Sequence, residues 1–269
     1  MTMRELPGRG AKVVVRAAIA PMMGEARIAG AQVSQRVCGQ ELEVLERGDG
    51  AADDWLRVRG GDAYEGWVHR GYLDTLAAFE PEREAIPISL GCTVESTEGA
   101  RRHLPLGARP WPDEVVVGGE TVSEPDLSDR FPRERERLIE SASEYFAGAP
   151  YQWGGVTPWG ADCSGFVQTI YGLHGIQLPR DAWQQAQIGE DAGADPEALA
   201  AADLLFFSDG PDGRITHVGI ALGASGMLHC ALGRGGWAVD VVGRDDPYQA
   251  ALLERFRFGR RITGWLDEA

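Results

Sequence analysis

The chain has 269 residues, of which 43% are hydrophobic and 25% are charged, and its formal net charge is −15. This length and composition are typical of a globular protein with one large domain or two to three small ones. The excess of 41 acidic over 26 basic residues excludes binding to nucleic acid or to an anionic membrane through bulk charge. We therefore expect neither a nucleic-acid nor a membrane partner.

The N-terminal segment lacks the pattern of an export signal. Its first apolar run ends at Arg16, and the next run, residues 17–23, is interrupted by Pro21. A signal peptide has a longer, uninterrupted apolar region, and no stretch approaches the roughly 18 apolar residues of a membrane span. We therefore expect this segment to form a β-strand of the mature fold, and we expect the protein to be cytoplasmic.

Residues 1–76 carry the pattern of a small β-barrel. Short apolar runs such as ELEVLE, DWLRVRG and YEGWVH are separated by glycine-rich turn signals. Five or six strands in so short a segment favour a barrel over a sandwich. A second β-rich region, from Ile86 to about Glu120, predicts a shortened second barrel. With its linker we assign this second domain to residues 77–128.

Residues 129–269 change to a helical pattern and then to strands. Helices are expected from Pro132 to Gly148, directly after Asp162, and from Ala182 to Ile188. Strands are expected at 203–208, 216–222, 226–232 and 237–242, and another strand or an irregular closure at the C-terminus. Helices first and strands afterwards within one segment predict an α+β layer domain.

The helix that follows Asp162 begins with Cys163. Apolar residues recur at helical spacing from Phe166 to Leu173, and Asp162 is a favourable N-cap residue. Because the free N–H groups and the dipole of a helix start stabilise an anion, the sequence predicts a depressed pKa and a nucleophilic thiolate for Cys163. A lone cysteine more often only fills space in a core, so this interpretation depends on its partners.

Two histidines of the late strands are the candidate partners. His217 shares a strand face with small residues, among them Gly219, and points away from the core side. If the two strands form a hairpin, His217 and His229 face one site only when the connecting loop holds an odd number of residues or a bulge intervenes. A five-residue loop from Gly223 to Met227, for example, would set Gly219 opposite His229.

A thiol nucleophile needs a base within hydrogen-bonding reach and a third group that orients this base. Cys163, His217 and His229 supply these roles in that order. Each histidine by itself is more often an ordinary strand residue, but the three together favour catalysis. Metal binding by the same three residues is the rival use, and it lacks a carboxylate or a close-spaced ligand pair. We therefore expect neither a metal nor a cofactor.

The remaining cysteines support this interpretation. The chain has Cys38, Cys92, Cys163 and Cys230, and no two of them have the CxxC spacing of a zinc site. If Cys163 is the nucleophile, three cysteines remain, which is an odd number for disulfide pairing. This suits a reducing compartment.

The segment from about Glu134 to Leu266, about half of the chain, resembles the NlpC/P60 family of papain-like cysteine peptidases. The matching residues are Tyr151, Trp153-Gly154-Gly155, Asp162-Cys163-Ser164-Gly165-Phe166-Val167, Leu178-Pro179-Arg180, Asp203-Leu204-Leu205-Phe206-Phe207, His217-Val218-Gly219-Ile220 and His229. The resemblance implies a papain-like domain preceded by two small SH3-like barrels, and it reproduces the family order of Cys, His and a polar third residue. Such enzymes cut peptidoglycan stem peptides, usually between γ-D-glutamyl and a diamino acid.

The N-terminal runs VSQRVCGQELEVLE, DWLRV and AYEGWV are similar to the bacterial SH3 domain of one subgroup of these peptidases. The resemblance implies that the chain is similar to γ-D-glutamyl-L-diamino acid endopeptidases, which act on free murein peptides with an unblocked N-terminal L-Ala. In this subgroup a tyrosine of the barrel, matching Tyr64, lines the site. The residue matching Asp162 binds the free amine together with an acidic residue of the barrel, for which we choose Glu25.

Further pocket positions follow from the same resemblance. Trp153 and Ser164 match residues of the substrate pocket. The glycines near Trp153 favour a cleft wall over a loop anchor for it, and Tyr64 could instead belong to the barrel core. The pair Arg180-Asp181 departs in part, because a small hydroxyl residue often follows this arginine. The sequence thus predicts a cysteine endopeptidase of cell-wall peptide recycling with a murein tri- or tetrapeptide as substrate. An amidase or acyltransferase on the same scaffold and an inactive wall-binding protein are the alternatives.

Overall fold

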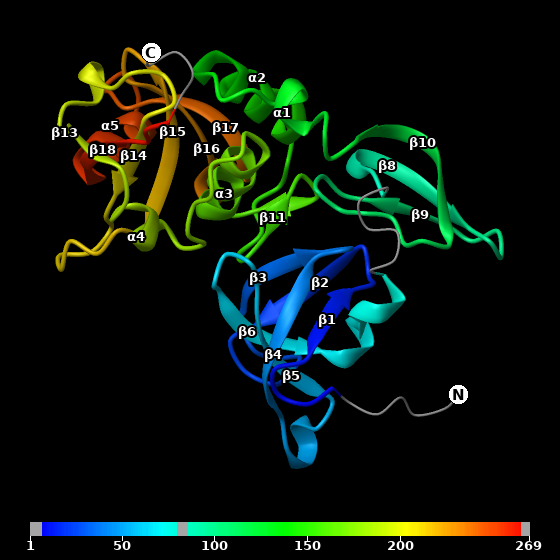
Figure 1. Ribbon diagram of the computed structural model, residues 1–269. Helices are drawn as coiled ribbons and strands as arrows, with labels where there is room; N and C mark the ends of the chain where they lie inside the picture. Colours follow the sequence, from blue (N-terminus) through cyan, green and yellow to red (C-terminus); the bar gives the residue numbers. More distant parts are fainter. Residues whose placement is uncertain (1–6, 80–85, 265–269) are drawn as a thin grey trace. The chain divides into compact units, whose positions relative to one another are not determined.

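A computed structural model describes residues 7–79 and 86–264 (Figure 1). Contacts divide the chain into two compact units, Met1–Leu127 and Ser128–Ala269. Within residues 7–79 and 86–264, no helix has the length and apolar character needed to cross a membrane. The two units are described in turn.

The first unit contains a seven-stranded antiparallel sheet in the order β3-β2-β6-β5-β4-β1-β7. Its strands are β1 (Lys12–Val15), β2 (Ile19–Met23), β3 (Gln32–Val37), β4 (Glu41–Arg47), β5 (Trp55–Arg59), β6 (Glu65–His69) and β7 (Leu73–Thr75). Short 3-10 helices occupy Gly50–Ala52, Arg70–Tyr72 and Leu76–Ala78. The predicted alternation holds in β4, where Leu42 and Val44 are buried in the core of this sheet.

A second, three-stranded sheet follows in the same unit. It consists of β8 (Ile88–Ser96), β9 (Arg101–Leu104) and β10 (Glu114–Val122) in the order β10-β8-β9. One buried cluster joins the two sheets: Val14 and Cys38 come from the first, and Cys92 and Trp111 from the second region. The two β-regions therefore share part of their core.

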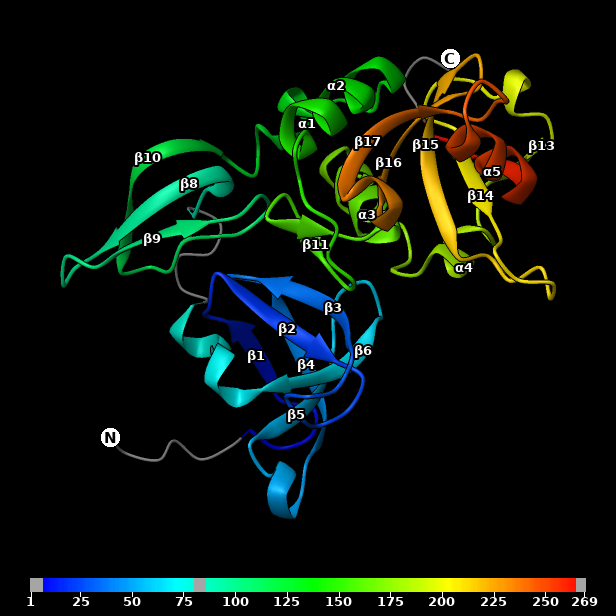
Figure 2. The same cartoon turned by 180° about the vertical axis from the view of Figure 1, so that it is seen from behind.

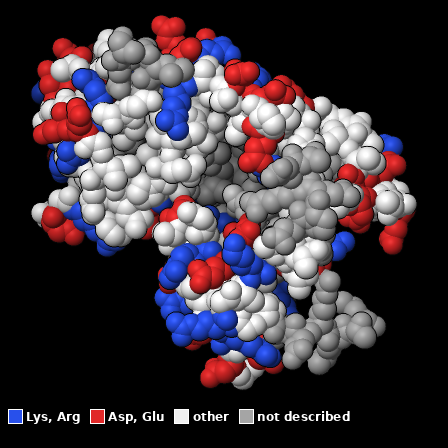
Figure 3. Space-filling model, in the orientation of Figure 1, with Lys and Arg blue, Asp and Glu red and all other residues white. Residues whose placement is uncertain are grey.

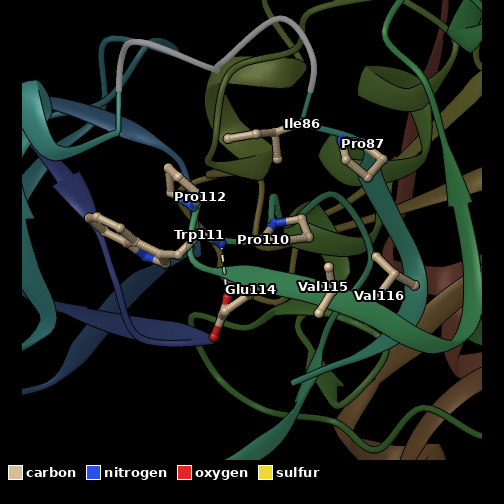
Figure 4. A pocket seen from close by; sticks show the side chains of 8 residues that line it. All are labelled: Ile86, Pro87, Pro110, Trp111, Pro112, Glu114, Val115 and Val116. Carbon is tan, nitrogen blue, oxygen red and sulfur yellow. Dashed lines mark hydrogen bonds between the residues drawn. The ribbon is translucent and has the colours of Figure 1, made fainter. Parts of the chain in front are cut away.

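The surface of the first unit has two further features. Figure 3 shows blue and red side chains interspersed over its visible face, and β5 and β6 contribute a ladder in which Arg57 and Arg59 bond Glu65. A largely apolar pocket lies beside the three-stranded sheet (Figure 4), where the Trp111 backbone N–H donates to Glu114 at 2.9 Å. None of the predicted site residues lines this pocket.

The second unit begins with helices. These are α1 (Leu127–Arg130), α2 (Arg135–Phe146), α3 (Cys163–Leu173) and the short α4 (Ala182–Gln185), and the two-residue strands β11 (Val156–Thr157) and β12 (Gly160–Ala161) precede α3. The helix expected to reach Ile188 ends at Gln185, because the following residues form i→i+3 turns that lead to Gly189 at φ +77°. That boundary prediction was wrong.

A six-stranded antiparallel sheet completes this unit, in the order β13-β18-β14-β15-β16-β17. The strands are β13 (Glu190–Gly193), β14 (Leu204–Phe207), β15 (His217–Gly223), β16 (Gly226–Ala231), β17 (Gly236–Val241) and β18 (Phe256–Arg261). Short 3-10 helices occupy Pro196–Ala198 and Leu232–Arg234. Helix α3 contacts β15 and β16, and Figures 1 and 2 show it beside these strands in both views. The predicted α+β class is confirmed.

The sequence analysis missed helix α5 (Pro247–Arg255). Its start signal is present in the sequence, because Asp246 precedes a proline at the first helical position. In the structure the Asp246 carboxylate accepts hydrogen bonds from the N–H groups of Tyr248 and Gln249 at 2.7 and 2.9 Å.

Candidate active site

The hairpin of β15 and β16 has the register that a shared histidine site requires. Ile220 pairs with Leu228 and Ala221 with Met227. Continuing this register sets Gly219 beside His229, whose Cβ lies 3.4 Å from the position of an added Cβ on Gly219. The predicted five-residue loop was wrong, because Met227, Gly226 and Gly223 are themselves paired in the hairpin. A register shift between Ala221 and Gly223 supplies the bulge that the prediction allowed as the alternative.

The two histidines contact each other directly. His217 Nε2 lies 2.9 Å from His229 Nδ1, and the ring planes are inclined by 70°. His229 is fully buried, whereas His217 is partly exposed. Because Nε2 of His217 is engaged by His229, its Nδ1 is the nitrogen left to act on a thiol.

The hydrogen-bonded chain continues to a residue that the sequence analysis missed. His229 Nε2 lies 2.9 Å from Asp240 Oδ2, and Arg234 donates from Nε and Nη2 to the two oxygens of the same carboxylate. Asp240 lies on β17, where Ala238 pairs with His229. A residue two positions beyond Ala238 shares its sheet face, so this alternation was the available signal once β17 was paired with β16.

Cys163 is the first residue of α3, as predicted, and only 7% of it is exposed. The prediction of a depressed thiol pKa was wrong. Burial, followed by the adjacent Asp162 carboxylate, raises the pKa of Cys163 to about 12, although hydrogen bonds from the backbone of Val218 and Ser164 and the Arg180 charge oppose this shift. The backbone N–H of Ser164 at the helix start still lowers this pKa, but burial outweighs it. The N–H of Gly165 donates to Asp162 at 2.7 Å instead.

The pKa of His217, the candidate base, is shifted in the opposite direction to that of the thiol. Burial, followed by the charges of His229 and Arg255, lowers the pKa of His217 to about 3. A raised thiol pKa and a lowered imidazole pKa both favour the uncharged pair of Cys163 and His217 in the free protein. The arrangement is therefore suited to general-base activation of the thiol during the reaction.

Asp162, Ser164 and Arg180 form a buried network at the same helix start. Arg180 donates to both oxygens of Asp162, at 3.0 and 2.7 Å, and also to Ser164 Oγ at 2.9 Å. Asp162 further accepts hydrogen bonds from Gly154 N, Gly165 N and Ser164 Oγ, so five donors surround its carboxylate. The sequence predicted the helix cap, but it did not reveal this ion pair with an arginine that is only 1% exposed.

The other predicted pocket residues differ in their surroundings. Asp181 adjoins this network in sequence, and its carboxylate accepts a hydrogen bond from Trp183 Nε1 at 3.2 Å. Trp153 is 66% exposed on the loop before α3. Tyr64, packed against the barrel core, and Glu25, paired with an arginine at 2.6 Å, belong to the first unit. Their place beside the cysteine stays a prediction.

Comparison with known proteins identifies two regions. Residues 148–253 match the NlpC/P60 family, and residues 25–74 match the bacterial SH3 domain. A gamma-D-glutamyl-L-lysine dipeptidyl-peptidase of Bacillus cereus is 27% identical over 263 residues, which cover 85% of this chain and 74% of that protein. The Bacillus subtilis protein of the same name is 42% identical over 95 residues, or 35% of this chain and 31% of that protein.

Two further matches extend this picture. The murein DD-endopeptidase MepS/murein LD-carboxypeptidase of Escherichia coli K12 is 31% identical over 158 residues, which cover 56% of this chain and 78% of that protein. The crystal structure of an NlpC/P60 family protein from Bacillus cereus ATCC 10987 superimposes with a TM-score of 0.74 at 20% identity, covering 93% of this chain and 99% of that one. The latter likeness concerns the fold.

Proposed function

Because the chain belongs to the NlpC/P60 family of cysteine peptidases, we propose that it cleaves the bond between γ-D-glutamate and the following diamino acid in murein stem peptides with a free N-terminal L-Ala. The observation that carries this proposal is one alignment that covers 85% of this chain and 74% of a gamma-D-glutamyl-L-lysine dipeptidyl-peptidase. The alignment to the Escherichia coli murein enzyme covers only 56% of this chain. The name dipeptidyl-peptidase describes the release of a dipeptide from an N-terminus.

The proposed reaction uses the uncharged pair of Cys163 and His217. Nδ1 of His217 takes the thiol proton while the sulfur attacks the γ-carbonyl carbon of D-glutamate. The backbone N–H of Cys163 holds the resulting oxyanion. His217, now an imidazolium, protonates the leaving amine of the diamino acid, and a thioester remains. Water, deprotonated by His217, then releases L-Ala-D-glutamate and restores the thiol.

Recognition of the substrate amine needs more than Asp162 in this proposal. The pair of Asp162 and Arg180 is neutral as a whole, so it offers no net attraction to an ammonium group. A second carboxylate would supply the charge, and Asp181, directly after Arg180, and Glu25 of the SH3 region are our candidates. Because an acylated amine is uncharged and carries a bulky acyl group, it cannot form the ion pair that these carboxylates would make with an ammonium group, and a blocked N-terminus should be rejected by about 10³-fold or more.

The required free L-Ala also bears on the biological setting. In intact peptidoglycan the amino group of this alanine is acylated by the glycan, so an unblocked peptide arises only after the two have been separated. We therefore propose recycling of released murein peptides in the cytoplasm as the setting.

The test uses L-Ala-γ-D-Glu-diaminopimelate and its L-Lys counterpart, each free and N-acetylated. The wild-type protein should release L-Ala-D-Glu from the free peptides only, and Cys163→Ala should release none. Adding a large excess of an amine acceptor separates hydrolysis from acyl transfer, since a transferase would yield an amide in place of the free acid. Absence of cleavage, or equal cleavage of the acetylated peptides, would contradict the proposal.

A further inference from the structure

The hydrogen-bonded chain behind the candidate base is longer than the three residues that such a thiol site needs. From His217 it passes through His229 to Asp240 and ends at Arg234. His229 is fully buried and Asp240 is 6% exposed, so water does not compete for the bond between these two residues. The two links made by His229 each join one atom on either side, and both distances are 2.9 Å.

The positions of the protons in this chain follow from its last acceptor. An ionised carboxylate only accepts hydrogen bonds, so His229 Nε2 must carry a proton toward Asp240. In a neutral ring, Nδ1 of His229 is then an acceptor, and it accepts a hydrogen bond from the N–H at Nε2 of His217. His217 Nδ1 is left with a free lone pair, and this is the atom that must deprotonate Cys163.

We propose that Asp240 is a positioning residue that selects the base-competent tautomer of His217 through His229, and that Arg234 holds Asp240 in this task. Without the carboxylate, the direction of hydrogen-bond donation between the two histidines can also be reversed. His229 Nδ1–H would then donate to His217 Nε2, and the proton on His217 Nδ1 would face the thiol. In that state His217 cannot act as a base, although every side chain remains in place.

Arg234 supports this assignment by its geometry. Its planar fork bonds both oxygens of Asp240, and the guanidinium stacks 4.0 Å from the centre of the Tyr248 ring. Burial by itself raises the pKa of Asp240, but the hydrogen bonds from Arg234 and His229 outweigh it, and the pKa lies below the usual range. Asp240 therefore stays an acceptor at neutral pH. An ion pair of purely structural value would need no contact with His229.

The inference rests on the proposed function for its kinetic readout, so the experiment also includes two readouts that need no substrate. The variants are Asp240→Asn, Asp240→Leu and Arg234→Gln, with Asp191→Asn as the matched control. Asp191 is an exposed aspartate on β13, at the opposite edge of the same sheet. Nitrogen-15 NMR of the imidazoles in a Cys163→Ala background reports which ring nitrogens carry protons, and it also shows whether each variant is folded.

In the spectra, we expect Nε2–H in both rings of the Cys163→Ala protein and of its Asp191→Asn variant, and a mixture of tautomers in its Asp240 variants. The rates below are measured on proteins that keep Cys163, and there the parent is the wild type. The kcat/KM for the free peptide should fall about 100-fold or more in the Asp240 variants, mainly through kcat, and about 10-fold in Arg234→Gln. Alkylation of Cys163 by iodoacetamide, followed by the mass of its peptide, should slow in the same order. The control should stay within about twofold on both rates.

The outcomes separate this inference from the proposed function. If folded Asp240 variants keep Nε2–H in both rings and alkylate at the parent rate, the inference is overturned, whatever the peptide assay shows. If the parent cleaves no murein peptide while the Asp240 variants still change tautomer and alkylation rate, the proposed function falls and the inference holds.

Discussion

Replacing Asp162 by Asn tests whether the helix start beside the thiol is a dry, charge-paired site. The substitution keeps Oδ1, which accepts the helix-capping bond from Gly165 N at 2.7 Å. It removes the negative charge and sets an –NH₂ group in place of Oδ2, against two donors, Gly154 N at 2.8 Å and Arg180 Nη2 at 2.7 Å. The change therefore isolates the ion pair from the helix cap.

The expected cost follows from the burial of both partners. The side chains of Arg180 and Asp162 are 1% and 8% exposed, so the guanidinium in the variant has no solvent to compensate the lost charge. Removing one partner of a buried ion pair destabilises a protein by about 3–5 kcal/mol. Because this cost comes from the uncompensated buried charge, Asp162→Asn with Arg180→Leu, which removes that charge as well, should recover about 2 kcal/mol or more.

The measurement must report on the second unit alone, since a chain of two units need not unfold in one step. Hydrogen exchange of peptides from α3 in increasing urea gives the free energy of opening this unit. Asp209→Asn is the matched control, because Asp209 and its partner Arg255 are each 54% exposed and their pair should be worth at most about 1 kcal/mol. If Asp162→Asn costs no more than this control, the pair is solvated and the reasoning fails.

Three further predictions concern the same unit. The pH profile of kcat/KM should lack an acid limb near the ordinary imidazole pKa of about 6.5, because burial lowers the pKa of His217 to about 3 and the neutral base persists as the pH falls from 7 to 4.5; a half-maximal rate near pH 6.5 would contradict this. Gly165→Ala should inactivate and destabilise the protein, because the added Cβ would lie 2.0 Å from a backbone oxygen. Gly172→Ala on the same helix has no atom within 4 Å of the added Cβ, so it should leave the free energy of unfolding unchanged or raise it by up to about 1 kcal/mol. Thermal unfolding and peptide cleavage compare the two variants. Tyr171→Phe should lower the free energy of unfolding by about 1–3 kcal/mol, because the buried hydroxyl donates to a backbone oxygen at 2.6 Å that the variant leaves unpaired; urea unfolding without a measurable shift would refute this.

Features set by local periodicity could be predicted from the sequence. The start of α3 at Cys163 followed from the N-cap residue and the apolar spacing behind it. The hairpin register followed from the requirement that both histidines face one side, since a one-residue slip moves a side chain to the other face. Both are properties of one or two neighbouring segments, so no knowledge of the remaining chain was needed.

The features that failed depend on tertiary packing. The thiol pKa was predicted from the helix start alone, but burial of Cys163 under the sheet and the competing carboxylate of Asp162 reverse the shift. The pairing of Arg180 with Asp162 joins residues 18 positions apart in the chain. Asp240 becomes visible only once β17 is known to pair with β16. No periodicity encodes such contacts.

The carboxylates of Asp162 and Asp240 are each paired with an arginine. Asp162 and Asp240 each accept two hydrogen bonds from an arginine, Arg180 and Arg234 respectively. The guanidinium of each pair opposes the charge of its carboxylate, and at Cys163 the Arg180 charge lowers the pKa that Asp162 raises. A net negative charge at either position would favour a proton on His217, and a net positive charge would favour loss of the proton from Cys163, before substrate binds. Paired carboxylates can instead orient their neighbours, a helix start in one case and an imidazole in the other, and leave proton transfer to the moment of attack.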